Sequence, residues 1–192
     1  MRERNYALFG LVAPLIAIFF IVVSIVLSPW FSWWSNALSD LGCSATTEVA
    51  PKSDVAPLFN FGLLLSGFFL IFYSITSFRN HAKYTSYVLV IVGLTLQLVA
   101  TFDEVYGSLH FQVSVLFFVA LGFASISYVI EKRSVIAFAS LIIGLASWIL
   151  YGLEIYSSGI AVPETISSMA SVTWVMLSAL RIHFGKSDRQ NP

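Results

Sequence analysis

The chain has 192 residues, of which 58% are hydrophobic and only 10% are charged, and its formal net charge is zero. A soluble globular domain carries roughly 25% charged residues, so this composition excludes an ordinary water-soluble fold. The single cysteine, Cys43, also excludes an intramolecular disulfide and a metal cluster of several thiolates. We therefore expect an integral membrane protein.

Six apolar stretches are long enough to cross a bilayer. A span needs about 20 apolar residues, and an open chain can satisfy its backbone hydrogen bonds in lipid only as a helix. The first stretch, Tyr6–Leu27, is longer than the apolar core of a signal peptide, and no small-residue cleavage site follows it, so we expect it to remain as a helix. The sequence predicts an all-α bundle in a single transmembrane domain, residues 1–192, with helices at about 6–27, 57–78, 84–102, 109–130, 135–155 and 165–183.

The charged residues are sorted between the two ends of these helices. If the helices alternate in direction, nine of the ten basic residues fall on one side: Arg2, Arg4, Arg79, Lys83, Lys132, Arg133, Arg181, Lys186 and Arg189. The other side has Lys52 and seven of the ten acidic residues: Asp40, Glu48, Asp54, Asp103, Glu104, Glu154 and Glu164. By the positive-inside rule the basic side is cytoplasmic. We expect a multi-pass protein of the cell membrane with both termini cytoplasmic. Its basic residues form a rim rather than a stripe for nucleic acid.

The connection at 28–56 is longer than the others and has an unusual composition. It begins with Trp30-Phe31-Ser32-Trp33-Trp34, and tryptophans beside a span are typical of headgroup depth. Residues 35–42 predict a short capped turn of helix that ends at Gly42. We expect this turn to lie on or dip into the outer leaflet.

Three carboxylates stand at the C-terminal ends of predicted helices. Asp103 and Glu104 follow 84–102, and Glu154 closes 135–155, where the negative end of the helix dipole disfavours a carboxylate. His110 opens 109–130, where the positive end disfavours an imidazolium. These positions favour the neutral forms, or a bound cation at the acids. The alternative is that all four side chains reach into headgroups and water.

Several uncharged polar residues fall in the outer third of the predicted spans, among them Asn60, Gln97, Gln112 and Ser114. Polar groups at this depth are costly without a partner. They could line one outward-facing pocket, or they could form hydrogen bonds between helices. The residues that we predict for ligand binding are Trp33, Trp34, Asn36, Asn60, Gln97, Glu104, Gln112 and Glu154.

Small residues indicate faces on which helices approach closely. Gly62 and Gly67 lie along 57–78, and Gly122 lies along 109–130. Because glycine has no side chain, two backbones can pack together there. Trp174, within the last span, is more typical of packing than of ligand binding.

Four residues on the outer side are candidates for catalysis: Ser39, Asp40, Asp103 and His110. Ser39 with His110 and Asp103 could form a hydrolytic triad, although no nucleophile-elbow motif surrounds Ser39. A catalytic zinc needs three protein ligands, and His110 is the one histidine expected near the outer face. We therefore expect no metal and no cofactor.

Three features of the chain together resemble a known family. They are the run Ser35–Gly42 after a Trp-rich turn, the Phe59-Asn60 opening of the second helix with its glycines, and the His110 opening of the fourth. They look like the prokaryotic six-span membrane proteins grouped as domain of unknown function 998, and the resemblance covers essentially the whole chain. The family implies a topology but no reaction.

The sequence favours a protein that binds lipid or a small amphiphile in an outward-facing polar pocket. One alternative is an intramembrane lipid-modifying hydrolase or transferase that uses Ser39, Asp40, Asp103 and His110. Another is a proton- or cation-coupled transporter that uses Asp103 and Glu154, although no predicted helix carries a charge at the bilayer midplane, where coupling sites usually lie. The expected partners are membrane lipids and not nucleic acid. The sequence leaves open whether the chain forms a homo-oligomer.

Overall fold

The computed structural model describes residues 2–48, 50–155 and 157–185, with side chains from residue 4 onward. The long helices are α2 (Phe9–Val26), α3 (Ala56–Tyr73), α5 (Lys83–Thr101), α6 (Ser108–Lys132), α7 (Val135–Gly152) and α8 (Ala161–Phe184). The shorter elements are α1 (Arg2–Tyr6), the 3-10 turns η1 (Leu38–Gly42) and η3 (Glu104–Tyr106), the π-helical η2 (Ser74–Phe78) and α4 (Arg79–His81). The described ranges contain no strand.

Six helical segments of the described chain are long and apolar enough to cross a membrane. This confirms the all-α, six-helix membrane fold, and the protein is a multi-pass membrane protein. The helix ends agree with the predicted ones to within a few residues. The predicted helix 57–78 corresponds to α3 together with η2, and the largest remaining differences lie at the last connection, where α7 ends at Gly152 and α8 begins at Ala161.

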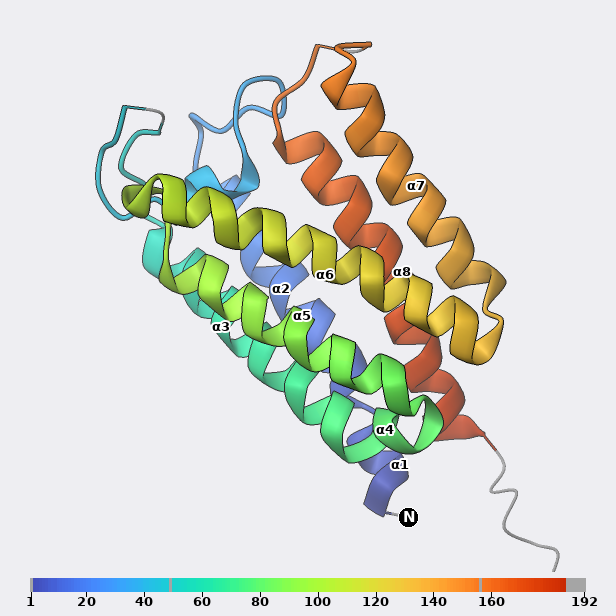
Figure 1. Cartoon of the computed structure of the whole chain (residues 1–192). Helices are drawn as coiled ribbons and strands as arrows, with labels where there is room; N and C mark the ends of the chain where they lie inside the picture. Colours follow the sequence, from blue (N-terminus) through green and yellow to red (C-terminus); the bar gives the residue numbers. More distant parts are fainter. Residues whose placement is uncertain (1, 49, 156, 186–192) are drawn as a thin grey trace, which may run out of the picture.

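The helices run antiparallel in chain order, as Figure 1 shows, and α8 returns to pack against both α7 and α2. We call the end with residues 28–48, 50–55, 102–107, 153–155 and 157–160 the acidic end, and the end with α1, α4 and the α6–α7 turn the basic end. Helices α1 and α8 meet there, where Arg4 Nε donates to the carbonyl of His183 at 3.0 Å. Lys186, Arg189 and the side chain of Arg2 lie outside the described residues.

Aromatic side chains fill the core toward the basic end. Trp174 of α8 is 1% exposed and stacks on Tyr128 of α6 with ring centroids 4.7 Å apart. Its indole N–H donates to the Ser125 hydroxyl at 3.2 Å, so the one polar atom of the ring is satisfied between helices. Trp174 is therefore a packing residue, as predicted.

Helices α6 and α7 share a tight turn at the basic end and then diverge. Arg133, with a φ of 50°, ends α6, and the Ser134 hydroxyl accepts from the Ala137 N–H at 3.2 Å to begin α7. From this turn the two helices separate toward the acidic end (Figure 1), and they pack against each other far less extensively than α7 and α8 do.

The glycine predictions divide at this divergence. A Cβ on Gly67 would lie 2.6 Å from the Gly93 carbonyl oxygen, so α3 and α5 do approach closely there. The expectation for Gly122 is wrong: a Cβ there would meet nothing within 4 Å. Because α6 has moved away from α7 at this level, Gly122 faces open space.

Candidate functional site

A groove of about 860 Å³ lies between the diverging helices α6 and α7. Its lining on α6 runs from His110 to Ile126, which is about 24 Å along a helix. The opposite wall comes from Leu141, Leu145, Trp148 and Tyr151 of α7, and residues 34–37, 39, 40, 104, 158–160 and 164 close the acidic end. The walls are apolar and partly exposed, so the groove opens sideways, toward the lipid.

The η1 turn closes the acidic end because it is fixed to its neighbours. The Asn60 amide of α3 donates to the Gly42 carbonyl at 2.9 Å, and a Cβ on Gly42 would collide with the Asn60 side chain. On the other side, Asn36 accepts from the Ala161 N–H at 2.9 Å through its backbone carbonyl. The predicted helical turn that ends at Gly42 is confirmed, and it lies inside the end of the bundle, with Leu41 and Gly42 buried.

Ser39, Glu104 and His110 form a continuous string of hydrogen bonds at the head of the groove. The Ser39 hydroxyl donates to Glu104 Oε1 at 2.7 Å, and His110 Nε2 lies 3.0 Å from the same oxygen. His110 Nδ1 lies 2.7 Å from the Phe102 carbonyl, which can only accept, so this nitrogen carries a proton. The Ser114 hydroxyl is 3.3 Å from Nε2.

Two further carboxylates complete what we call the polar cluster, which consists of Ser39, Asp40, Glu104, His110, Ser114 and Glu164. Asp40 Oδ2 accepts from the Asn36 amide at 2.8 Å and from the Ala37 N–H at 3.1 Å. Glu164, in the first turn of α8, accepts from the Leu38 N–H at 2.7 Å through Oε2. An acid in the first turn of a helix is favoured by the dipole.

Two acids of the polar cluster, Asp40 and Glu104, lie outside the membrane-spanning helices, and their pKa values are shifted in opposite directions. Burial raises the pKa of Asp40, and the nearby Glu104 raises it further, against hydrogen bonds from Asn36 and Ala37. Burial also acts to raise the pKa of Glu104, but the hydrogen bonds from His110 and Ser39 outweigh it, so this pKa is lowered. Glu104 is thus held as a carboxylate, whereas Asp40 is costly to ionise.

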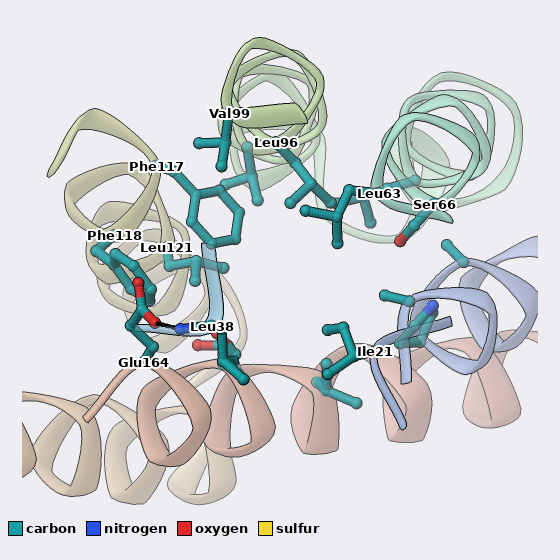
Figure 2. Close-up of a pocket in the computed structure, with 18 of the residues that line it drawn as sticks. Ile21, Leu38, Leu63, Ser66, Leu96, Val99, Phe117, Phe118, Leu121 and Glu164 are labelled. Carbon is teal, nitrogen blue, oxygen red and sulfur yellow. Dashed lines mark hydrogen bonds between the residues drawn. The ribbon is translucent and has the colours of Figure 1, made fainter. Parts of the chain in front are cut away.

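The polar cluster also borders a second, inner cavity of about 150 Å³ among α2, α3, α5, α6 and α8. Figure 2 shows this cavity, with the Glu164 carboxylate between Phe118 and Leu38 and its hydrogen bond to Leu38 as a dashed line. Apart from Ser39, Glu164 and a few serines, its lining is apolar. Ser39, Ser114, Phe118 and Glu164 line both cavities.

The structure brings some of the predicted site residues together and separates others. Ser39, Asp40, His110, Glu104, Asn36 and Trp34 line the groove, and Asn60 supports it from behind through Gly42. Asp103 does not join the string, because its carboxylate accepts from the Val105 N–H at 3.0 Å and the Ser44 N–H at 3.2 Å. The expected triad of Ser39, His110 and Asp103 is therefore not assembled, and the acid that contacts both Ser39 and His110 is Glu104.

The remaining predicted residues lie outside the groove lining. Gln97 donates to the Leu64 carbonyl at 3.2 Å, which is a bond between α5 and α3 of the kind offered as the alternative. Gln112 and Glu154 are exposed, and Glu154 follows the end of α7 with a φ of 55°. Trp33 packs its ring against Phe31, and its backbone carbonyl accepts from the Gly159 N–H at 2.9 Å.

Sequence reasoning missed Glu164 as a site residue. Because the predicted last span begins at 165, Glu164 falls in the connection before it. The signal that could have found it is Pro163-Glu164, since proline and an acid are both favoured in the first turn of a helix.

The family model described as "Protein of unknown function (DUF998)" matches residues 11–181. The chain belongs to this family. No curated protein and no solved structure matches it. The family match therefore places this DUF998 protein without giving it a reaction, and the site has to be interpreted from its own chemistry.

The order of groups in the string decides what it can do chemically. In a serine hydrolase triad the imidazole contacts the serine and removes its proton. In this DUF998 protein the carboxylate of Glu104 stands between Ser39 and His110, and its lowered pKa makes it a weak base. Among the described residues, no group of three or more His, Cys, Asp or Glu side chains is arranged to hold a metal ion. The order of these groups therefore differs from that of a serine hydrolase triad.

Proposed function

We propose that this protein binds a single amphiphile, with its apolar tail in the groove between α6 and α7 and its polar head at the polar cluster. The observation that carries the proposal is the shape of the groove: it is open along its side, apolar over most of its length, and polar at one end. A membrane lipid has the same division into head and tail. An amphiphile can enter sideways from the bilayer without losing its apolar surroundings.

The depth of the polar cluster supports this assignment. His110, Asp40 and Glu164 are 5%, 7% and 8% exposed. Polar groups held this close to hydrocarbon are costly unless they have partners, and a ligand head supplies partners that lipid tails do not. Trp34 at the mouth of the groove is 73% exposed, which suits an aromatic ring at headgroup depth.

The test is native mass spectrometry of the protein purified in a mild neutral detergent. We expect a fraction of the protein to retain one amphiphile at collision energies that remove loosely bound detergent, and its mass identifies the compound class. Protein that carries no amphiphile, and takes up none when single-chain amphiphiles are added, would falsify the proposal.

The hydrogen bond from Ser39 to Glu104 is the observation behind a second candidate, an intramembrane lipid-modifying enzyme, although the lowered pKa of Glu104 makes it a weak base. In that case Ser39 would be the nucleophile and Glu104 its base. The alternative predicts turnover of a lipid by the protein in nanodiscs, and it predicts that Ser39→Ala abolishes this turnover while Ser44→Ala, outside the groove, does not. Unchanged turnover in Ser39→Ala excludes this candidate.

We further propose that the polar cluster faces the outside of the cell membrane. The basic residues at the opposite end support this orientation through the positive-inside rule. In a Cys43→Ala background, which has no other cysteine, Asp54→Cys should react with a membrane-impermeant maleimide on intact cells. Ser134→Cys should react after permeabilisation only, and the reverse pattern would show the opposite orientation.

A further inference from the structure

We propose that the polar cluster selects an amphiphile whose head carries a primary ammonium group. This inference deepens the proposed function, since it names the head that the groove accepts. It rests on how the three carboxylates use their oxygens, on the charges that line the groove, and on the aromatic rings around its mouth.

Each carboxylate of the polar cluster uses one oxygen for the protein and leaves the other without a donor. Glu104 Oε1 accepts from Ser39 and His110, Asp40 Oδ2 accepts from Asn36 and Ala37, and Glu164 Oε2 accepts from Leu38. Among the described residues, nothing donates to Glu104 Oε2, Asp40 Oδ1 or Glu164 Oε1. None of the three is a fully buried atom without a partner, so each keeps some exposure, and all three belong to residues that line one groove.

The charges around the groove are unbalanced. Three carboxyl groups face one imidazole, and the described residues of the lining include no lysine or arginine. His110 pairs with Glu104, which leaves Asp40 and Glu164 without a cation in the described lining. A phosphate or carboxylate head would make the ionisation of these two acids costlier still, whereas a cationic head would offset that cost. A cation is the head that the field favours.

A primary ammonium fits this arrangement better than a quaternary one. It brings three N–H donors on a compact charge, which equals the number of carboxylate oxygens that lack a donor. Hydrogen bonds between charged partners are the strong ones. Trp34, Trp148 and Tyr151 in the walls add ring faces that attract cations, and these would hold a quaternary head as well, but without the hydrogen bonds.

Two kinds of molecule carry this head: a phospholipid that ends in an ethanolamine, and a single-chain amine without a phosphate. Both are tested by native mass spectrometry in neutral detergent. One mixture contains equal amounts of dodecylammonium, dodecyltrimethylammonium, dodecanol and dodecanoate. The other contains phosphatidylethanolamine, phosphatidylcholine and phosphatidylglycerol with identical chains.

We expect the primary ammonium to bind at least about tenfold more tightly than the alcohol, because one charged hydrogen bond already accounts for such a factor. The trimethylammonium should fall between them, and the carboxylate should bind least. Preference for phosphatidylethanolamine over phosphatidylcholine identifies a phospholipid ligand, and preference in the first mixture alone identifies a single-chain amine.

The variants isolate the carboxylates without removing their hydrogen bonds to the protein. In the double variant Asp40→Asn, Glu164→Gln the amide oxygens can still accept from Ala37 and Leu38, but the charge is gone. We expect the preference for ammonium over alcohol to drop below about threefold, since both charged contacts are lost. The matched control, Asp54→Asn with Glu154→Gln, removes two exposed carboxylates outside the groove and should keep the preference.

Three outcomes overturn the inference: equal binding of ammonium and alcohol by the wild type, equal binding of primary and quaternary heads, or an unchanged preference in the double variant. In each of these the amphiphile still binds, so the proposed function stands. If no amphiphile of either mixture binds, the proposed function fails, and the inference fails with it.

Discussion

Filling the groove at Gly122 tests whether an amphiphile tail lies between α6 and α7. The Gly122→Leu variant should fold well, because a Cβ at this position would meet no atom within 4 Å. In addition, leucine is favoured over glycine in a helix by up to about 1 kcal/mol. Gly122 is twelve residues beyond His110, or about 18 Å along α6. An alkyl chain advances roughly 1.25 Å per carbon, given a C–C bond near 1.5 Å, so the block stands about fourteen carbons from the head.

The expected result depends on chain length. A ten-carbon amphiphile ends before Gly122 and should bind to Gly122→Leu as it binds to the wild type. In an eighteen-carbon amphiphile about four methylenes would extend past the leucine and could no longer be buried in the groove. Each of them contributes at most about 0.8 kcal/mol of binding free energy. Because the detergent is an equally apolar solvent for the tail, the displaced methylenes lose less than this. We therefore expect the affinity of the eighteen-carbon form to fall by about tenfold, which is less than four full methylene contributions would give.

The assay is competition between the ten- and eighteen-carbon forms of one amphiphile, followed by native mass spectrometry. Gly152→Leu is the matched control, since a Cβ there also meets nothing within 4 Å but Gly152 does not line the groove. Equal losses for both chain lengths, or the same change in Gly152→Leu, would refute the placement of the tail.

Two further predictions concern the support of the polar cluster. Asn60→Ala removes the hydrogen bond to the Gly42 carbonyl and should lower the free energy of unfolding by about 1 kcal/mol. Thermal unfolding in detergent measures this effect. The control, Gln112→Ala at an exposed position, should change the free energy of unfolding little. Asp40→Asn should stabilise the protein increasingly as pH rises from about 3 to 7. Because the folded pKa of Asp40 is raised above its unfolded value near 3.9, the aspartate costs nothing while it is protonated in both states and destabilises once the unfolded chain ionises it. A difference in stability that is constant with pH would contradict the raised pKa of Asp40.

The membrane fold could be predicted because its causes are local. An apolar run of sufficient length predicts each span. The short connections between most of the spans then require the connected helices to be antiparallel neighbours. The short helical turn that ends at Gly42 could also be predicted, because its supporting bond is local: Asp40 accepts from the Ala37 N–H three residues before it. These features need no knowledge of how distant segments pack.

The site was only partly readable because it depends on direction and on helix crossing. Asp103 and Glu104 are neighbours in the chain, but their side chains bond to different segments: Asp103 to Ser44, and Glu104 to Ser39 and His110. Composition and spacing cannot say which of two adjacent acids points at the groove. The prediction of a close helix contact at Gly122 was wrong for a related reason. A small residue allows close packing only where a neighbouring helix lies near, and α7 has diverged from α6 at this level.

If an amphiphile binds as proposed, its head rather than its tail should provide the selectivity. A tail that moves from the bilayer into an apolar groove exchanges one hydrocarbon surrounding for another, so it gains little free energy. The polar cluster is different, because carboxylates held beside hydrocarbon lose hydration that only a polar or charged partner can replace. Among the described lining residues, His110 is the one basic side chain that faces Asp40, Glu104 and Glu164. Under the proposed function the missing positive charge comes from the head of the ligand, and we expect a head without it to bind less tightly.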